Sequence, residues 1–190
     1  VGALPDLAHD WEVPVWAHPA EHPYLTGVAA YPPPDPRAGG LMAGLSPLFP
    51  RDAVDLRPWL RALPPDGSLP HLAGWRWIAT PGHTPGHVSL WRDADRLLVS
   101  GDALITTRQE ALLPVLAQRP ELHGPPAYFT PDWLEAAESI QRIAALRPKT
   151  ILPGHGRAMA GAAMEAALAT LARDALRIIP PRGQGVVVPA

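Results

Sequence analysis

Residues 80–87 read TPGHTPGH, and this is the stretch of the 190-residue chain that decides its fold. Its prolines stiffen the segment while its glycines let it bend, so the imidazole of His87 is held in a preset direction. The alternating residues VSLW follow at once and predict a strand. A rigid turn that presents imidazole at a strand edge is suited to metal binding. We take His87 as the ligand and His83 as a residue that orients the turn.

Two later segments end in the same way. Residues 97–102 read LLVSGD, an apolar run that closes on glycine and presents Asp102, and residues 150–156 read TILPGHG and present His155. A carboxylate beside a buried strand is costly unless it meets a cation or several donors. We therefore expect the three strand ends to converge, so that His87, Asp102 and His155 form a metal site.

The amino-acid composition limits which side chains can bind a metal and which partners are expected. The chain has no cysteine, so a metal must be held by imidazole and carboxylate groups. With 16 basic and 18 acidic side chains the net charge is -2, which gives no general attraction for a polyanion, and nucleic acid is not an expected partner. The sequence shows neither a run of about 18 apolar residues nor a secretory start, so we expect a cytoplasmic protein with no membrane contact.

The pattern of strands and helices favours one α/β or α+β domain over residues 1–190. A proline-rich, irregular excursion over residues 24–70 interrupts the regular pattern. Strands are predicted at residues 13–17, 74–79, 88–91, 96–100 and 150–152, and helices at residues 4–11, 130–146 and 164–179. Thr130 is the predicted N-cap of the second helix, with Pro131 at its first position. His18, where the first strand ends, is a candidate pocket residue.

The three turn motifs, in this order, resemble the second half of the metallo-β-lactamase superfamily, with the glyoxalase II-like hydrolases as the nearest group. The resemblance implies an αββα sandwich and two divalent metal ions, zinc first, with iron or manganese as alternatives. It also implies that His87 binds one metal, His155 binds the other, and Asp102 bridges them as the catalytic carboxylate.

One family motif, His-x-His-x-Asp-His, does not occur in this sequence. The first residues resemble the segment that comes directly after that motif in the family, so we expect the motif, and the first strands of the sandwich, to precede Val1. Three protein ligands shared by two metals are fewer than a catalytic zinc takes. We therefore expect the segment by itself to retain metal weakly.

The function implied by the resemblance is hydrolysis of an ester, thioester, lactone or amide by a metal-bound hydroxide. The substrate would be a small molecule, held by apolar walls at residues 39–50 and 125–129. Two alternatives stay open: a mononuclear iron dioxygenase of the same fold, and a non-catalytic truncated remnant. The apolar faces also permit a homodimer.

Overall fold

The structure, a computed structural model, describes residues 3–35, 55–107 and 120–177. In chain order its elements are α1 (Leu4–Asp10), β1 (Val15–Ala17), the short 3-10 helix η1 (Pro19–Glu21), α2 (His22–Leu25), β2 (Leu60–Ala62), β3 (Trp75–Ala79), β4 (Val88–Arg92), β5 (Leu97–Gly101), η4 (Ala127–Phe129), α5 (Trp133–Ala145), β6 (Thr150–Pro153), β7 (Met159–Ala160), α6 (Ala162–Asp174) and η5 (Ala175–Arg177). The predicted mixture of helices and strands is confirmed. None of the helices in the described ranges has the length and apolar content that crossing a membrane requires.

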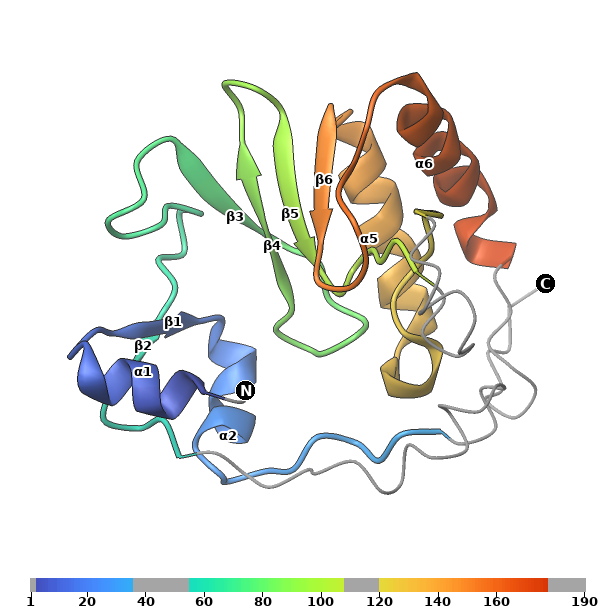
Figure 1. Ribbon diagram of the computed structural model, residues 1–190. Helices are drawn as coiled ribbons and strands as arrows, with labels where there is room; N and C mark the ends of the chain where they lie inside the picture. The colour runs from blue at the N-terminus through green and yellow to red at the C-terminus, as the bar shows by residue number, and fades with distance from the viewer. Residues whose placement is uncertain (1–2, 36–54, 108–119, 178–190) are drawn as a thin grey trace.

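Five strands form a mixed sheet in the order β3-β4-β5-β6-β7 (Figure 1). Strand β4 is antiparallel to both β3 and β5, whereas β5 and β6 are parallel. Strands β3, β5 and β6 therefore run in the same direction. Their carboxyl ends lie at one edge of the sheet, and the three turn motifs of the sequence come directly after those ends.

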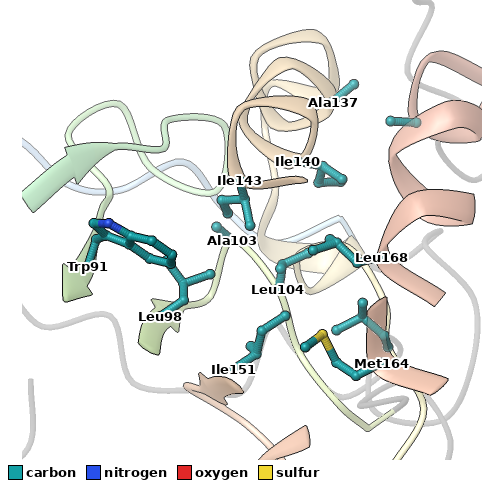
Figure 2. Packing of buried hydrophobic residues seen from close by; sticks show 12 residues of the cluster. Trp91, Leu98, Ala103, Leu104, Ala137, Ile140, Ile143, Ile151, Met164 and Leu168 are labelled. Carbon is teal, nitrogen blue, oxygen red and sulfur yellow. The ribbon is translucent and has the colours of Figure 1, made fainter. Parts of the chain in front are cut away.

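Helices α5 and α6 lie together and cover one face of this sheet (Figure 1). Register places Trp91, Leu98 and Ile151 side by side on neighbouring strands, so they form one apolar row on that face. The helices pack onto this row with the buried side chains Ala137, Ile140, Ile143, Met164 and Leu168 (Figure 2). This contact holds the strand ends in place, because it fixes the sheet that carries them.

The proline-rich excursion contains more order than predicted. Residues 60–62 form β2, which pairs in parallel with β1 from Val15↔Leu60 to Ala17↔Ala62. Pro58 and Pro64 bracket this short ladder and explain why sequence patterns miss it, because too few residues lie between them to show a period. The predicted wall at residues 39–50 lies outside the described residues.

The start of α5 differs from the prediction. Asp132, and not Thr130, is the N-cap: its backbone is extended and its carboxylate accepts a hydrogen bond from the Glu135 amide at 2.9 Å. Thr130 instead donates its hydroxyl to the carbonyl oxygen of Pro126 at 2.7 Å. Pro131 thus precedes the cap, where its fixed φ favours the extended approach to the helix.

We expect the face of α5 that meets the sheet to dominate its contribution to stability. Ile143 is fully buried on that face, whereas Leu134 is 53% exposed on the same helix. Replacing Ile143 by Ala should lower the free energy of unfolding by about 2–5 kcal/mol, because it removes apolar contacts and leaves a cavity. Leu134→Ala is the matched control and should cost less than about 1 kcal/mol. Urea denaturation would measure both, and equal losses would contradict this packing.

Candidate metal centre

Three potential ligands meet at the edge of the sheet where β3, β5 and β6 end. Asp102 follows β5 directly, His155 lies in the turn after β6, and His83 lies in the turn between β3 and β4. The Nε2 atom of His83 is 3.4 Å from Oδ2 of Asp102, and the Nε2 atom of His155 is 3.4 Å from Oδ1. The predicted convergence of Asp102 and His155 is thus present, with His83 as the third member.

These spacings suit ligands that share a metal ion. Two donors each about 2.1 Å from a tetrahedral cation are separated by roughly 3.4 Å, which is longer than a good hydrogen bond. The two imidazoles approach different oxygens of one carboxylate. A carboxylate with a separate imidazole on each oxygen has the donor arrangement needed to bridge two cations.

Within the described ranges, neither of the two imidazole–carboxylate pairs, His83 with Asp102 or His155 with Asp102, is a complete metal site. No group of three or more His, Asp or Glu side chains there could hold a single ion. Each pair offers one imidazole and one carboxylate oxygen, fewer than the three protein ligands of a typical catalytic zinc. The residues fit part of a two-metal site.

His87, the predicted ligand, is engaged elsewhere through both ring nitrogens. Its Nε2 accepts the backbone N–H of Asp102 at 3.0 Å. Because a backbone amide can only donate, the proton of the neutral ring must sit on Nδ1, which lies 3.1 Å from the Thr80 carbonyl oxygen and 2.9 Å from its hydroxyl. Neither nitrogen has a free lone pair for a metal, so the geometry corrects the sequence-based assignment of His87.

His83 fits the ligand role that sequence patterns assign to His87. Its Nε2 faces Asp102, and its buried Nδ1 has no hydrogen-bond partner among the residues that the structure describes. The two histidines occupy the same turn, and their rings stand nearly perpendicular at 6.1 Å between centroids. Sequence alone could not separate them, because the choice depends on which ring meets the Asp102 amide.

Hydrogen bonds from three directions hold the turn that carries His83. Ser139 of α5 donates to the Pro81 carbonyl at 2.8 Å, and the Asp132 amide donates to the Gly82 carbonyl at 3.3 Å. Near the other end, the Gly86 amide donates to the carboxylate of Glu21 at 2.6 Å. Sequence analysis missed Glu21, since one acidic residue in a short proline-flanked helix gives no local signal.

The turn that carries His155 is held against β5 and the segment after it. The Gly154 amide donates to the Gly101 carbonyl at 2.9 Å, and the Thr106 amide donates to the His155 carbonyl at 2.9 Å. A Cβ at Gly154 would collide with Oδ1 of Asp102. Glycine is needed at this position for the carboxylate to lie so close to the turn.

His18 does not join this site. Its Nδ1 accepts the Ala20 amide at 3.3 Å and so caps η1, and its ring meets the edge of Trp77 at 5.6 Å between centroids. These contacts give it a structural role where β1 leads into η1. Its predicted place as a pocket residue has no support from contacts within the described ranges.

Burial and charge set the protonation of the site. Burial lowers the pKa of His83, and burial together with the nearby His83 lowers the pKa of His87 to about 4. Burial alone would raise the pKa of Asp102, but His155, His83 and His87 outweigh it and hold that pKa below its usual value. Asp102 in turn raises the pKa of His155. Near neutral pH the site therefore offers a charged carboxylate flanked by the neutral ring of His83.

Comparison with known proteins identifies the family of this chain. The family model described as "Metallo-beta-lactamase superfamily" matches residues 1–155. The probable metallo-hydrolase YflN of Bacillus subtilis (strain 168) is 54% identical over 173 residues, which are 90% of this chain and 66% of that protein. The chain thus spans about two thirds of the length of this relative.

Two solved structures share the fold. ST1585 of Sulfolobus tokodaii, an archaeal metallo-beta-lactamase superfamily protein, aligns with a TM-score of 0.57 and 18% identity over 100% of this chain and 68% of its own. TTHA1623, crystallised in a di-iron-bound form, aligns with a TM-score of 0.53 and 24% identity over 91% of this chain and 69% of its own. At these identities the alignments establish the fold alone.

Replacing His83 should mainly affect Zn²⁺ binding, whereas replacing His87 should mainly affect the stability of the fold. His83→Ala should weaken Zn²⁺ binding at least about tenfold while changing the stability of the metal-free protein by less than about 1 kcal/mol. His87→Ala should destabilise the metal-free protein by about 1–3 kcal/mol, because it leaves the partly buried Asp102 amide without its acceptor. Chelator competition and urea denaturation in EDTA would measure the two effects. The reverse pattern would restore His87 as the ligand.

Acid should destabilise the metal-free fold through His87. The pKa of this group is about 4 in the folded protein and about 6.5 when unfolded, so between these values the unfolded chain binds the extra proton. Stability should therefore fall as pH drops from about 6.5 toward 4, by up to about 1.4 kcal/mol per pH unit from this group. The raised pKa of His155 acts in the opposite sense. His87→Gln should flatten the profile measured by urea denaturation, and an unchanged slope would refute the assignment.

Proposed function

The chain belongs to the metallo-β-lactamase superfamily, and on that premise we propose that it carries part of the active site of a metal-dependent hydrolase. The proposed substrate is a small molecule with an ester, thioester, lactone or amide bond. The observation that carries this proposal is the pair of imidazoles on opposite oxygens of Asp102, each at 3.4 Å.

The proposed ligands from this chain are His83 for one divalent cation, His155 for a second, and Asp102 for both. When bound, such a pair of cations lowers the pKa of water to about 7 and polarises a carbonyl oxygen. Zinc is the proposed metal, because imidazole and carboxylate donors without thiolate suit it. The same donors also suit iron, the metal in the TTHA1623 structure.

Other residues of the chain hold the Asp102 carboxylate in position and keep it charged before a metal binds. The Asp102 backbone is held by His87, so its carboxylate extends from a fixed point between the two imidazoles. Asp102 stays charged because of its histidine neighbours, which matters for a group that must bind cations. His155 is about half exposed, and this open side of the site is where we place the approach of a substrate.

Of the predicted apolar wall at residues 125–129, only part is open to a substrate in the proposed site. Tyr128 is 6% exposed and packs in the interior, so it does not offer a free surface to a substrate. Phe129 is partly exposed beside it, with the two rings 4.7 Å apart between centroids. Phe129 is therefore the side chain of this segment that we propose as a contact for an apolar acyl group.

Asp102→Asn, made in the complete protein, tests the proposed function. The substitution keeps the shape and the backbone bond to His87, so the protein should remain folded. It removes the charge that binds both cations, and kcat/KM on a panel of p-nitrophenyl esters, acyl thioesters and lactones should fall on the order of a hundredfold or more. Metal content would be measured by mass spectrometry on the same samples.

Asp95→Asn, at an exposed surface pair with Arg92, is the matched control and should leave both readings unchanged. Full turnover in the Asp102→Asn variant would contradict the assignment of this carboxylate. A wild-type protein with one iron per chain and no hydrolysis of the panel would favour the dioxygenase alternative, and one that binds no metal at all would favour the non-catalytic alternative.

A further inference from the structure

Glu21 is an acidic side chain in an unusual position. It is 9% exposed and lies at the end of η1, well away in sequence from the three turn motifs. A buried carboxylate normally requires a cationic partner, and no Lys or Arg side chain of the described residues pairs with it. Its hydrogen bonds come from two neutral donors, the Gly86 amide and the Tyr31 hydroxyl.

The contact with Gly86 joins distant parts of the chain. Glu21 Oε1 accepts the Gly86 amide at 2.6 Å, across 65 residues of sequence. A Cβ at position 86 would lie 2.7 Å from Cγ and 2.9 Å from the backbone nitrogen of Glu21, so only glycine lets η1 approach the turn this closely. Gly86 lies between His83 and His87 in the turn that presents both rings.

Tyr31 completes the arrangement from the other side. Its hydroxyl donates to Oε2 of Glu21, and its ring stacks on Tyr24 at 4.3 Å with an interplanar angle of 10°. The second carboxylate oxygen is thereby fixed, which leaves Oε1 directed at Gly86. The charge of Glu21 also acts on the pKa values of His83 and His87, although burial dominates both shifts.

We propose that Glu21 is a positioning residue for the metal centre, because its carboxylate fixes the Gly86 amide and thereby holds His83 at its distance from Asp102. The other anchors of the turn, Ser139 and Asp132, hold Pro81 and Gly82 on one side of His83. Glu21 anchors Gly86 on the other side, next to the contacts that His87 makes with Asp102 and Thr80. Without it, the half of the turn that follows His83 loses a charge-assisted hydrogen bond.

This inference rests on the proposed function for the identity of the ligands, but it has a consequence in the metal-free protein. Glu21→Met keeps the volume and removes both acceptors, and Glu21→Gln keeps an acceptor for Gly86 while its amide N–H can donate to the Tyr31 oxygen. The two variants therefore separate the hydrogen bond from the negative charge. Leu168→Ala, in the core under α6, is the control for general loss of stability.

The experiment combines two readouts on the same proteins. Hydrogen exchange of the Gly86 amide, followed by NMR in EDTA, should be at least about tenfold faster in Glu21→Met. Zn²⁺ affinity, measured by chelator competition, should be about 10–100-fold weaker in that variant. Glu21→Gln should restore both values to within a few fold of wild type, and Leu168→Ala should leave the affinity unchanged.

Three outcomes would overturn the proposal: wild-type affinity in Glu21→Met, failure of Glu21→Gln to rescue it, or an equal loss in Leu168→Ala. A wild-type protein that binds no Zn²⁺ while Glu21→Met still speeds exchange at Gly86 would instead refute the proposed function. In that case Glu21 would keep its role in ordering the turn.

Discussion

The hydrogen bond from the backbone amide of Asp102 to Nε2 of His87 determines how the site can work. It joins the end of β5 to the end of the turn before β4, and it fixes the protonated nitrogen of His87 on the side of Thr80. With His87 used in this way, the carboxylate of Asp102 is left to face His83 and His155. One imidazole of the turn thus supports the backbone, and the other, that of His83, is the one that we propose as a metal ligand.

The directions of the strands explain why residues so far apart in sequence meet. Strands β3, β5 and β6 run the same way, so their carboxyl ends share one edge, while the apolar row under α5 and α6 keeps the strands in register. Because each turn begins where a strand ends, the register of the sheet sets where His83, Asp102 and His155 lie.

Sequence patterns predicted much of this arrangement, and the exceptions have physical causes. Strand alternation and closing glycines located the turns at Asp102 and His155 because those signals are local. The choice between His83 and His87 was wrong because both occupy equivalent positions in a near-repeat, and only the tertiary contact with the Asp102 amide distinguishes them. Glu21 and β2 were missed for a similar reason, since each acquires its role from a distant partner.

The charges around the site favour a cation. His83 and His87 are buried and neutral at pH 7, whereas Asp102 is charged and Glu21 lies buried behind the turn with neutral donors. Of the groups in contact with Asp102, His155 has a raised pKa and can offset part of this negative charge by taking up a proton. A divalent cation on the same carboxylate would displace that proton, because a metal ligand must be deprotonated. If His83 and His155 are the ligands that we propose, proton and metal would compete at His155, whereas the neutral ring of His83 would need to lose no proton. Metal uptake would then depend on pH mainly through His155, the more exposed of the two imidazoles.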